Sequence, residues 1–234
     1  MSNSLVIPLA GYGKRFVREG YKTLKPFLKI DKKNNMLDLI IGNFPRNTKK
    51  IFVVRKNIQT KYLKILKRYK NSEIFFINPH NLGPLYSIYL IRKKFKKLKN
   101  IFLSYCDIHW NKKSIKIKKL KSNYVYCFKG WHPFTYDNNN YAFCKVDKDI
   151  IESVREKGSF TKKWQKEPLS IGLFFFKTGI EMNDSLEKVI KKKIKVHNEY
   201  FPSLAFNFLK SKRVKFVNYF LWIQRQTNHL HYLS

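Results

Sequence analysis

The stretch LAGYGKRFVREGYKTLKPFLKI, residues Leu9–Ile30, holds two glycines and two well-spaced cations directly after an apolar run. Gly11, Gly13 and Arg15 form the pattern G-x-G-x-R, and Lys25 follows ten residues after the arginine. Glycines lack a Cβ atom and let backbone N–H groups approach phosphate oxygens, and an arginine grips two such oxygens at once. The pattern therefore predicts a phosphate-binding loop, whereas the simpler alternative is a glycine turn with solvated cations.

This loop differs from the two common nucleotide-binding patterns. It lacks the third glycine of G-x-G-x-x-G, and the P-loop pattern G-x-x-x-x-G-K-[ST] occurs nowhere in the chain. The chain also has no G-x-S-x-G, no H-E-x-x-H and no Cys/His cluster with zinc spacing. These absences argue against a dinucleotide-binding fold, a P-loop NTPase, a serine hydrolase and a zinc enzyme.

The composition is that of a folded protein of the cell interior. Hydrophobic residues make up 44% of the 234 residues and aromatic residues 16%, more than a disordered chain carries. The most apolar run, Ile171–Phe176, is far shorter than the ~18 residues of a membrane-spanning helix. The start of the chain lacks the basic region of a secretory signal, and three cysteines without a C-x-x-C pair argue against a disulfide framework. We expect one domain, residues 1–234, in the cytoplasm and without membrane insertion.

The balance of charge is strongly basic. Lys and Arg number 49 against 15 Asp and Glu, and the net charge of +34 creates a positive field that attracts polyanions. The lysines, however, are spread through the whole chain beside abundant Asn and Ile, and a coding bias toward A/T-rich codons gives the same composition. Nucleic-acid binding is therefore a secondary hypothesis when it rests on charge alone.

Strand and helix patterns alternate through the first half of the chain. The expected strands are Leu5–Ala10, Ile51–Val54, Glu73–Ile77 and Ile101–Tyr105, and the expected helices are Met36–Phe44, Gln59–Tyr69 and Pro84–Phe95. Because strand and helix alternate, the pattern predicts a largely parallel sheet with helices on its faces.

The second half adds further strands and two helices. The expected strands are Tyr124–Phe128, Tyr141–Val146, Ile171–Lys177 and Val214–Phe220. Asp184 with Glu187 resembles a capping box, so a helix is expected to begin there, and another is expected near Pro202. The predicted fold is α/β, a single Rossmann-like domain with a mixed, mainly parallel sheet flanked by helices.

Three polar clusters follow expected strands, at residues 11–15, 78–83 and 106–109. Because ligands of open parallel sheets bind beyond the carboxyl ends of the strands, these clusters are expected to meet at one rim. Asp107 in the last cluster can hold a hard cation such as Mg²⁺, although a helix N-cap or a turn aspartate is the alternative. His109 is either a second polar contact or an exposed loop histidine.

The dipeptide Glu156-Lys157 follows another strand-like stretch. As a surface ion pair it would contribute little to stability. In a functional pair, the lysine would reach the phosphate of a second substrate and the glutamate would contact the polar body of that substrate. The dipeptide becomes informative only together with the other clusters.

Several segments, in this order along the chain, resemble the sugar-phosphate nucleotidyltransferases, enzymes of GT-A-like Rossmannoid fold that activate small phosphates with an NTP. The matching segments are LVIPLAGYGKRFVREGYKTLKPFLKI, NLGPLYSI, LSYCDIHW, VREKGSFT, EPLSIGLFFFKTG and NEYFPSLAFNFL, which together run from about Leu5 to Tyr219. The motifs SYCD, HP…YAFCKVD and EK.SFT most resemble those of the branch found in bacterial capsule and surface-polysaccharide loci. That branch includes the cytidylyltransferases that activate phosphoglutamine.

The resemblance implies a reaction and a role for each matching residue. It implies that an NMP unit moves from a CTP-like NTP to a small phosphorylated acceptor, such as a sugar phosphate, and that pyrophosphate leaves. The residues implied to bind the NTP are Leu9, Ala10, Gly11, Gly13, Asn81 and Gly83, with Gly83 against the base. The implied catalytic residues are Arg15, which steadies the departing pyrophosphate, Lys25, which contacts the reacting phosphate, and Asp107, which ligates Mg²⁺. The residues implied to bind the acceptor are Glu156, Lys157, Gly172 and Glu199.

The end of the chain departs from the family pattern. Relatives usually carry W-G-T-P-E-D-L where this chain has WIQRQTNHLHYL, with residues 227–230 in rough register. In related enzymes a carboxylate from this part of the site can complete the metal coordination. The alternative hypothesis is therefore a catalytically weakened member that acts as a polyanion- or nucleic-acid-binding protein. A GT-A glycosyltransferase is disfavoured, because G-x-G-x-R with Lys25 suits a triphosphate better than a nucleotide sugar.

Overall fold

The structure is a computed structural model that describes residues 3–110, 117, 120–130, 141–217 and 220–222. Its strands are β1 (Ser4–Pro8), β2 (Lys49–Arg55), β3 (Ser72–Ile77), β4 (Lys99–Ser104), β5 (Ile108–Trp110), β6 (Asn123–Phe128), β7 (Ala142–Asp147), β8 (Ile150–Glu156), β9 (Leu169–Thr178), β10 (Lys212–Phe216) and β11 (Phe220–Trp222). Its α-helices are α1 (Lys14–Arg18), α2 (Met36–Gly42), α3 (Thr60–Lys67), α4 (Pro84–Leu90) and α5 (Gly179–Lys191). Its 3₁₀ helices are η1 (Lys25–Phe27), η2 (Arg92–Phe95), η5 (Trp164–Lys166) and η6 (Pro202–Phe208).

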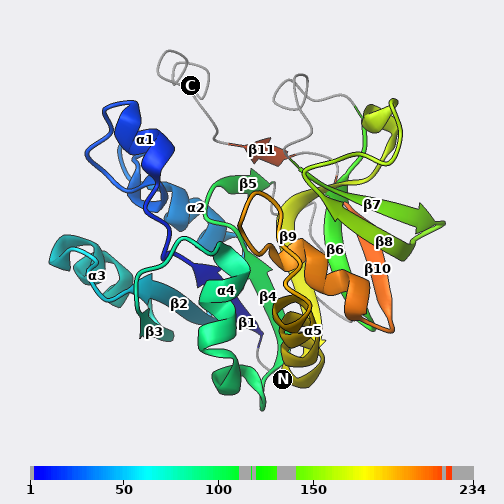
Figure 1. The fold of residues 1–234 in the computed structure, drawn as a ribbon. Coiled ribbons are helices and arrows are strands. Elements are labelled where there is room, and N and C mark those ends of the chain that lie inside the picture. Colours follow the sequence, from blue (N-terminus) through cyan, green and yellow to red (C-terminus); the bar gives the residue numbers. More distant parts are fainter. Residues whose placement is uncertain (1–2, 111–116, 118–119, 131–140, 218–219, 223–234) are drawn as a thin grey trace.

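A nine-stranded sheet in the order β3-β2-β1-β4-β9-β6-β10-β8-β7 forms the centre of the protein (Figure 1). From β1 the chain moves outward through β2 and β3, and then returns to place β4 on the other side of β1. The strand order therefore reverses between β1 and β4. In open α/β sheets this switch point is where a crevice forms at the carboxyl ends of the strands.

Both faces of the sheet are buried, because successive residues of the strands are apolar. In β1, Leu5 and Ile7 join a hydrophobic cluster with residues of α2 and α3, whereas Val6 points to the other face and joins residues of α4, α5 and η6. A strand covered on both faces is expected to be apolar throughout, as this one is. The longest described helix, α5, has 13 residues, and the search of the described residues finds no helix with the length and apolarity to cross a membrane.

The expectation of a mainly parallel sheet is wrong. Among the strand pairings of this sheet in the described residues, four are parallel and five are antiparallel. The parallel part contains the βαβ units of the first half, as predicted. The difference arises at β9, which inserts antiparallel between β4 and β6. A strand that is buried on both faces is apolar whether it runs parallel or antiparallel to its neighbours. The residues of β9 therefore do not indicate its direction in the sheet.

The helix expected to begin at Asp184 begins earlier. Helix α5 starts at Gly179, where the Thr178 side chain accepts a hydrogen bond from the Glu181 backbone N–H at 3.2 Å and donates one to the Glu181 carboxylate at 2.8 Å. Asp184 lies within the helix and is exposed. The real cap was overlooked because Thr178 ends a strand and starts a helix without a loop between them.

Two other expected elements are shorter than predicted. The helix expected over residues 84–95 ends at Leu90 and continues as η2 after a break at Ile91. The strand expected over residues 214–220 is β10, which ends at Phe216. Phe220 belongs instead to β11, which pairs with β5 in a separate two-stranded sheet.

Candidate functional site

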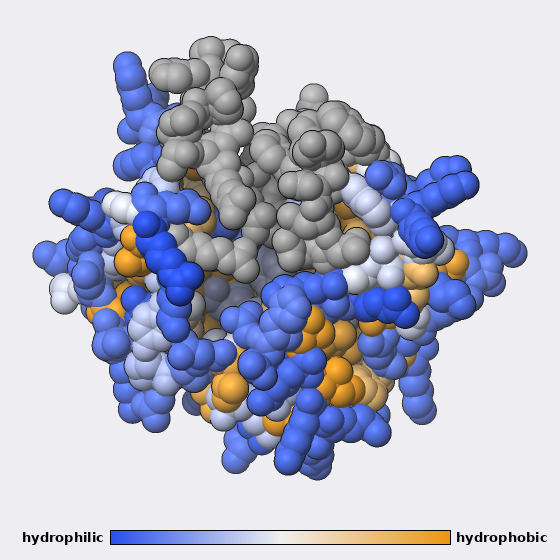
Figure 2. All heavy atoms as spheres, turned by 45° about the horizontal axis from the view of Figure 1, so that its top comes forward, coloured by the Kyte–Doolittle hydropathy of each residue, from blue (hydrophilic) through white to orange (hydrophobic). Residues whose placement is uncertain are grey.

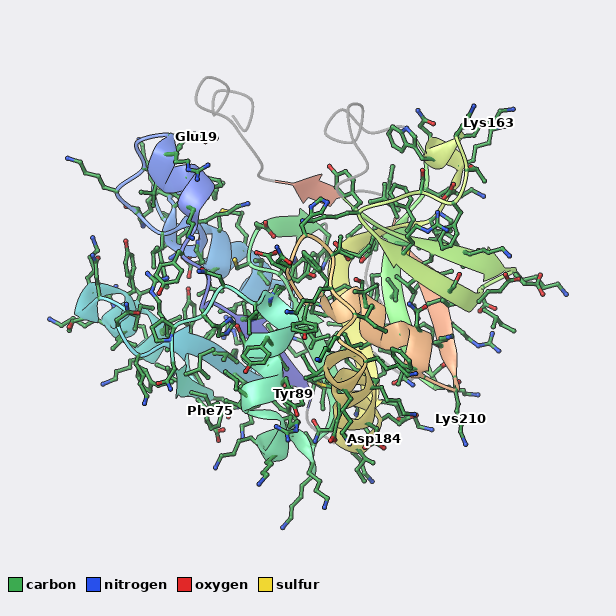
Figure 3. All side chains as sticks on the ribbon, in the orientation of Figure 1. Glu19, Phe75, Tyr89, Lys163, Asp184 and Lys210 are labelled. Carbon is green, nitrogen blue, oxygen red and sulfur yellow. The ribbon has the colours of Figure 1, made fainter. Side chains whose placement is uncertain are left out.

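A cavity of about 690 Å³ opens where β1 and β4 end. This volume lies within the range of ~300–1,000 Å³ that is typical of small-molecule sites. Figure 2 turns this end of the sheet toward the reader and shows hydrophilic side chains over most of the surface. In Figure 3, Glu19, which lines the cavity, lies at the same end, whereas Phe75, Tyr89, Asp184 and Lys210 lie at the opposite end.

The cavity brings together residues that the sequence analysis selected from distant segments. Its lining includes Leu9, Ala10, Gly11, Gly13, Lys25, Asn81, Gly83, Asp107, Glu156, Lys157, Gly172 and Glu199. The side chains of Arg15 and His109 lie outside the described part of the structure, and so do residues 227–230. The roles of all the selected residues stay predictions. The fold itself, however, brings the lining residues from distant segments into one cavity.

The glycine loop begins where β1 ends. The Leu9 N–H donates to the Val53 carbonyl at 2.7 Å, which extends the pairing of β1 with β2 to the start of the loop. Arg55, at the end of β2, donates to the Gly11 carbonyl at 2.7 Å and places its guanidinium 4.5 Å from the centre of the Tyr12 ring. The sequence analysis did not select Arg55, which anchors the loop through the Gly11 carbonyl. The pairing of β1 with β2 brings Arg55 to the loop, and this pairing is visible only in the structure.

Lys25 and Asp107 form an ion pair within the cavity. The Lys25 Nζ lies 2.8 Å from the Asp107 Oδ2, and only 14% and 20% of the two side chains are exposed. Lys25 comes from η1 and also lies 4.8 Å from the centre of the Phe16 ring. The pair therefore sits between the glycine loop after β1 and the carboxyl end of β4, where a cation and a carboxylate can both act on a phosphate.

Asp107 has the chemistry of a magnesium ligand. Its second oxygen, Oδ1, is buried and has no hydrogen-bond partner among the described residues. A carboxylate oxygen left without a partner is costly unless something binds it, and Mg²⁺ prefers oxygen ligands. No group of three or more His, Cys, Asp and Glu side chains that could hold a metal ion occurs in the described part of the chain. A single carboxylate such as Asp107 fits Mg²⁺ bound together with a nucleotide, where one or two carboxylates, substrate phosphates and water hold the ion.

Gly83 is required by close packing of two loops. Its φ is +85°, and a Cβ atom there would lie 2.7 Å from the Tyr200 carbonyl oxygen and 2.9 Å from the Glu199 Cβ. The Tyr200 N–H donates to the Leu82 carbonyl, and the Tyr200 carbonyl accepts from the Leu85 N–H. These contacts tie Gly83 to the segment that carries Glu199, and Gly83 also lines the cavity. Its position against the base stays a prediction.

His80 and Ser87 also line the cavity near Gly83. The Leu82 N–H donates to the His80 Nδ1 at 3.1 Å, so the proton of a neutral ring is on Nε2, which lies 3.1 Å from the Ser87 Oγ. Burial lowers the pKa of His80 and keeps the ring neutral. In this tautomer the His80 Nε2–H donates to the Ser87 oxygen, and the hydroxyl proton of Ser87 is left for donation to another group.

Glu156 ends β8, where it pairs with Ala142 of β7, and it lines the cavity. It is buried, and the Ser203 hydroxyl donates a hydrogen bond to its Oε2. Burial raises the pKa of Glu156 to about 7, and the negative charge of Glu199 adds to this, whereas the Ser203 hydrogen bond and Lys157 oppose it. A glutamate with such a pKa is partly protonated at neutral pH.

Lys157 follows Glu156 in the left-handed region, with φ of +53°. Its N–H donates to the Tyr141 carbonyl at 2.8 Å, and its Nζ lies 4.8 Å from the centre of the Phe201 ring. The Nζ is also 3.5 Å from the His197 Nδ1. These contacts hold the ammonium group at the cavity wall.

Tyr105 was overlooked by the sequence analysis. It lies directly after β4 and lines the cavity, and its buried hydroxyl has no hydrogen-bond partner in the part of the chain that the structure describes. Burial raises the pKa of Tyr105 well above its usual value, and the negative charges of Glu156, Asp107 and Glu199 raise it further. The hydroxyl is therefore a neutral donor among carboxylates. Its backbone N–H donates to the Gly172 carbonyl at 3.0 Å, at a point where β9 bulges and Gly172 has φ of +75°.

The raised pKa of Glu156 predicts a pH dependence of stability. The folded state binds the proton of the Glu156 carboxyl more tightly than the unfolded state does. The stability that this proton contributes is therefore complete below pH 4.5 and is lost as the pH rises to about 7. The loss is about 3 kcal/mol at ~1.4 kcal/mol per pKa unit. Urea unfolding between pH 4.5 and 8 should show that Glu156→Gln, which stays neutral, loses less stability in this window than the wild type. The exposed Glu152→Gln is the control, and equal slopes for the wild type and Glu156→Gln would contradict the assignment.

Comparison with solved structures identifies the fold. The nucleoside-diphosphate-sugar pyrophosphorylase of Vibrio cholerae RC9 superposes with a TM-score of 0.76 over 93% of this chain and 94% of that chain, at 16% sequence identity. The chain has a nucleotidyltransferase fold. CTP:phosphocholine cytidylyltransferase of Streptococcus pneumoniae matches with a TM-score of 0.72 over 95% and 94% of the two chains, at 13% identity. Inositol-1-phosphate CTP transferase of T. maritima matches at 0.70 over 94% and 88%, at 14% identity.

No protein-family model and no curated protein sequence matches the chain. At identities of 10–16% the likeness shows the nucleotidyltransferase fold, and the chemistry has to be argued from the cavity itself.

Proposed function

We propose that the protein is a nucleotidyltransferase that moves an NMP unit from a CTP-like NTP to a small phosphorylated acceptor and releases pyrophosphate. The observation that carries the proposal is the partly buried ion pair of Lys25 and Asp107, which lines the same cavity as the glycine loop and Glu156-Lys157. Among the described residues, the Asp107 Oδ1 has no hydrogen-bond partner. CTP appears in the names of two of the structurally similar enzymes, which supports CTP as the donor. We place the reaction in the cytoplasm, in the synthesis of precursors for capsule or surface polysaccharide.

In this reaction an oxygen of the acceptor phosphate attacks the α-phosphorus in line, and the bond between the α-phosphorus and the bridging oxygen breaks. Pyrophosphate leaves with that oxygen. Two unit charges ~4 Å apart at an effective dielectric near 20 repel by about 4 kcal/mol, so bringing two anions together needs cations. Lys25 would stabilise charge at the reacting phosphate, and Lys157 would hold the phosphate of the acceptor.

The glycine loop and Asp107 complete the proposed NTP site. Gly11 and Gly13 would present backbone N–H groups to the triphosphate, and Arg55 keeps the loop in place through the Gly11 carbonyl. Arg15 is proposed to steady the pyrophosphate. Asp107 would hold Mg²⁺ through its free oxygen, and the bound ion would neutralise charge on the triphosphate.

The decisive experiment measures pyrophosphate release. The full chain is incubated with Mg²⁺, each of the four NTPs and a panel of acceptors that includes glucose 1-phosphate, phosphocholine and phosphoglutamine. Release is expected with at least one pair and only when both substrates are present. No release with any pair, from a protein whose thermal unfolding shows that it is folded, would contradict the proposal.

Lys25→Met is expected to lower kcat/KM by about 10- to 100-fold, because a cation at the developing charge is removed. Lys29→Met is the matched control, since Lys29 is exposed, donates to the Lys33 carbonyl and is not among the described residues that line the cavity. Steady-state rates of pyrophosphate release for both variants test the prediction. Similar rates for Lys25→Met and the wild type would remove Lys25 from the reacting centre.

The net charge of +34 favours one other candidate, a weakened enzyme that binds polyanions or nucleic acid. Binding of an oligonucleotide would then weaken steeply with salt and would be unaffected by Lys25→Met. A flat salt response would dismiss this candidate.

A further inference from the structure

A run of cations stands out within the basic sequence. Residues 74–106 contain no Asp or Glu, and all six of their Lys and Arg residues fall within the eight residues Arg92–Lys99. A coding bias alone raises the number of lysines, but it does not gather them in one segment and exclude acids from its surroundings. The concentration of charge in this segment therefore calls for a physical explanation.

The fold places this segment at the end of the protein opposite the cavity. The segment forms η2 and begins β4 at Lys99, whereas the cavity opens where β4 ends. Lys99 pairs with Thr178 of β9, so the exposed Lys177 lies beside the segment. The start of α5 covers η2, because Gly179 packs directly against the Phe95 carbonyl. Residues from β9 and α5 thus join the cations of η2 on one face.

Six exposed lysines define this face, which we call the lysine face: Lys93, Lys94, Lys96, Lys97, Lys99 and Lys177. None of them forms an ion pair with a residue that the structure describes. The acids nearby are few. Asp184 is exposed at the same end of the protein (Figure 3), and Glu187 is paired with Lys191 at 3.0 Å. The lysine face therefore carries a surplus of positive charge.

Two exposed apolar side chains beside the lysine face are aliphatic. Leu90 precedes η2 and is 42% exposed, and Ile180 follows Gly179 and is 54% exposed. The ring of Tyr89, in contrast, is covered by the Arg92 guanidinium at 3.9 Å from its centre. Single-stranded nucleic acids bind by stacking bases on free aromatic faces. Aliphatic side chains among cations suit the boundary between lipid headgroups and acyl chains better.

We propose that the lysine face docks the protein on a membrane surface that contains anionic phospholipids. The lysines contact the phosphate groups of the lipids, and Leu90 and Ile180 rest at the level of the headgroups. Each lysine near such a surface contributes about fivefold in affinity, so that several together give reversible peripheral binding. This inference goes beyond the proposed nucleotidyl transfer and does not depend on it.

Docking through the lysine face leaves the cavity open. The described residues that line the cavity include no residue of the lysine face and neither Leu90 nor Ile180. In Figure 3, Glu19 at the cavity and Tyr89 next to η2 lie at opposite ends of the protein. Small molecules can therefore enter the cavity while the protein is docked.

Cosedimentation of the full chain with lipid vesicles tests the proposal. Vesicles of phosphatidylcholine mixed with phosphatidylglycerol are compared with vesicles of phosphatidylcholine alone. Affinities for a single-stranded and a double-stranded oligonucleotide are measured in the same buffer. The chain is expected to bind the anionic vesicles about 100-fold or more tightly than the neutral ones, and added salt should weaken this binding.

A triple variant locates the docking face. It replaces three exposed lysines that make no described side-chain contact, as Lys93→Gln, Lys96→Gln and Lys97→Gln. At about fivefold per lysine, binding to anionic vesicles should weaken by about 100-fold. Thermal unfolding checks that the variant is folded.

The matched control removes the same charge at the other end of the protein. It replaces three exposed lysines in and near η5, as Lys162→Gln, Lys163→Gln and Lys166→Gln. Lys163 lies at the same end as Glu19 in Figure 3. Because these lysines face away from the docked membrane, binding should weaken by less than about tenfold.

An apolar substitution separates a bilayer from other polyanions. Ile180→Ser should weaken binding to anionic vesicles by about threefold to tenfold and leave oligonucleotide binding unchanged, because only a bilayer offers an apolar layer. Val17→Ser is the matched control, since Val17 is 60% exposed but belongs to α1 at the cavity end. It should change neither affinity.

Three outcomes would overturn the docking face. The first is equal affinity for anionic and neutral vesicles. The second is an equal loss of vesicle binding in the two triple variants, which would show that the charge of the whole chain acts without a defined face. The third is tighter binding of an oligonucleotide than of the anionic vesicles, lost in the Lys93, Lys96 and Lys97 variant, which would assign the lysine face to nucleic acid.

Discussion

Asp107→Asn is expected to lower kcat/KM for pyrophosphate release by about 10²- to 10³-fold. The amide keeps the shape of the side chain and one neutral oxygen, but it removes the negative charge that pairs with Lys25 and that would bind Mg²⁺. Both losses act on the reacting phosphate, so the effect should exceed that of removing Lys25 alone. The concentration of Mg²⁺ that gives half-maximal rate should rise as well.

Asp149→Asn is the matched control for this variant. Asp149 forms an exposed ion pair with Arg213 and does not line the cavity, so its substitution should leave the rate unchanged. Titration of Mg²⁺ against the rate for both variants separates a metal ligand from a purely structural carboxylate. An unchanged Mg²⁺ requirement in Asp107→Asn would remove Asp107 from the metal site.

Gly83→Ala is expected to destabilise the protein by about 2–4 kcal/mol. An alanine at φ +85° adopts a strained backbone, and its Cβ would meet the Tyr200 carbonyl oxygen at 2.7 Å. The clashing atoms belong to the backbone, so the two loops have to move apart. At ~2–4 °C per kcal/mol for a chain of this size, the melting temperature should fall by about 5–15 °C.

Gly42→Ala provides the comparison for Gly83→Ala. Gly42 is the exposed last residue of α2, and an added Cβ would meet nothing within 4 Å. Alanine there should be neutral or stabilising by up to about 1 kcal/mol. Thermal unfolding of both variants measures the difference. Equal melting temperatures would show that the Gly83 loop does not pack on Tyr200 as described.

Much of the cavity follows from local sequence. The glycine loop and Asp107 follow the apolar runs that form β1 and β4, and Lys25 comes in η1, after α1. The carboxyl ends of the parallel neighbours β1 and β4 meet at one edge of the sheet. Glycines and charged residues after a buried strand are visible without coordinates. The convergence of these segments was predicted for that reason, although a helix N-cap or a turn aspartate was the alternative for Asp107.

Other residues of the site depended on long-range packing. Arg55 reaches the glycine loop only because β1 and β2 pair in a particular parallel register. The pKa of Glu156 depends on burial against Ser203, 47 residues away in sequence. Tyr105 in LSYCD is an ordinary strand-end aromatic until three carboxylates are placed around it.

The apolar strands, the βαβ units of the first half and the segments with Gly11, Lys25 and Asp107 could be predicted, because they depend on the periodicity and identity of neighbouring residues. The antiparallel insertion of β9 between β4 and β6, and the presence of Glu156 and Glu199 in one cavity, could not be predicted in the same way. Strand direction, the burial of a charge and the pKa that follows from burial depend on contacts between segments far apart in the chain.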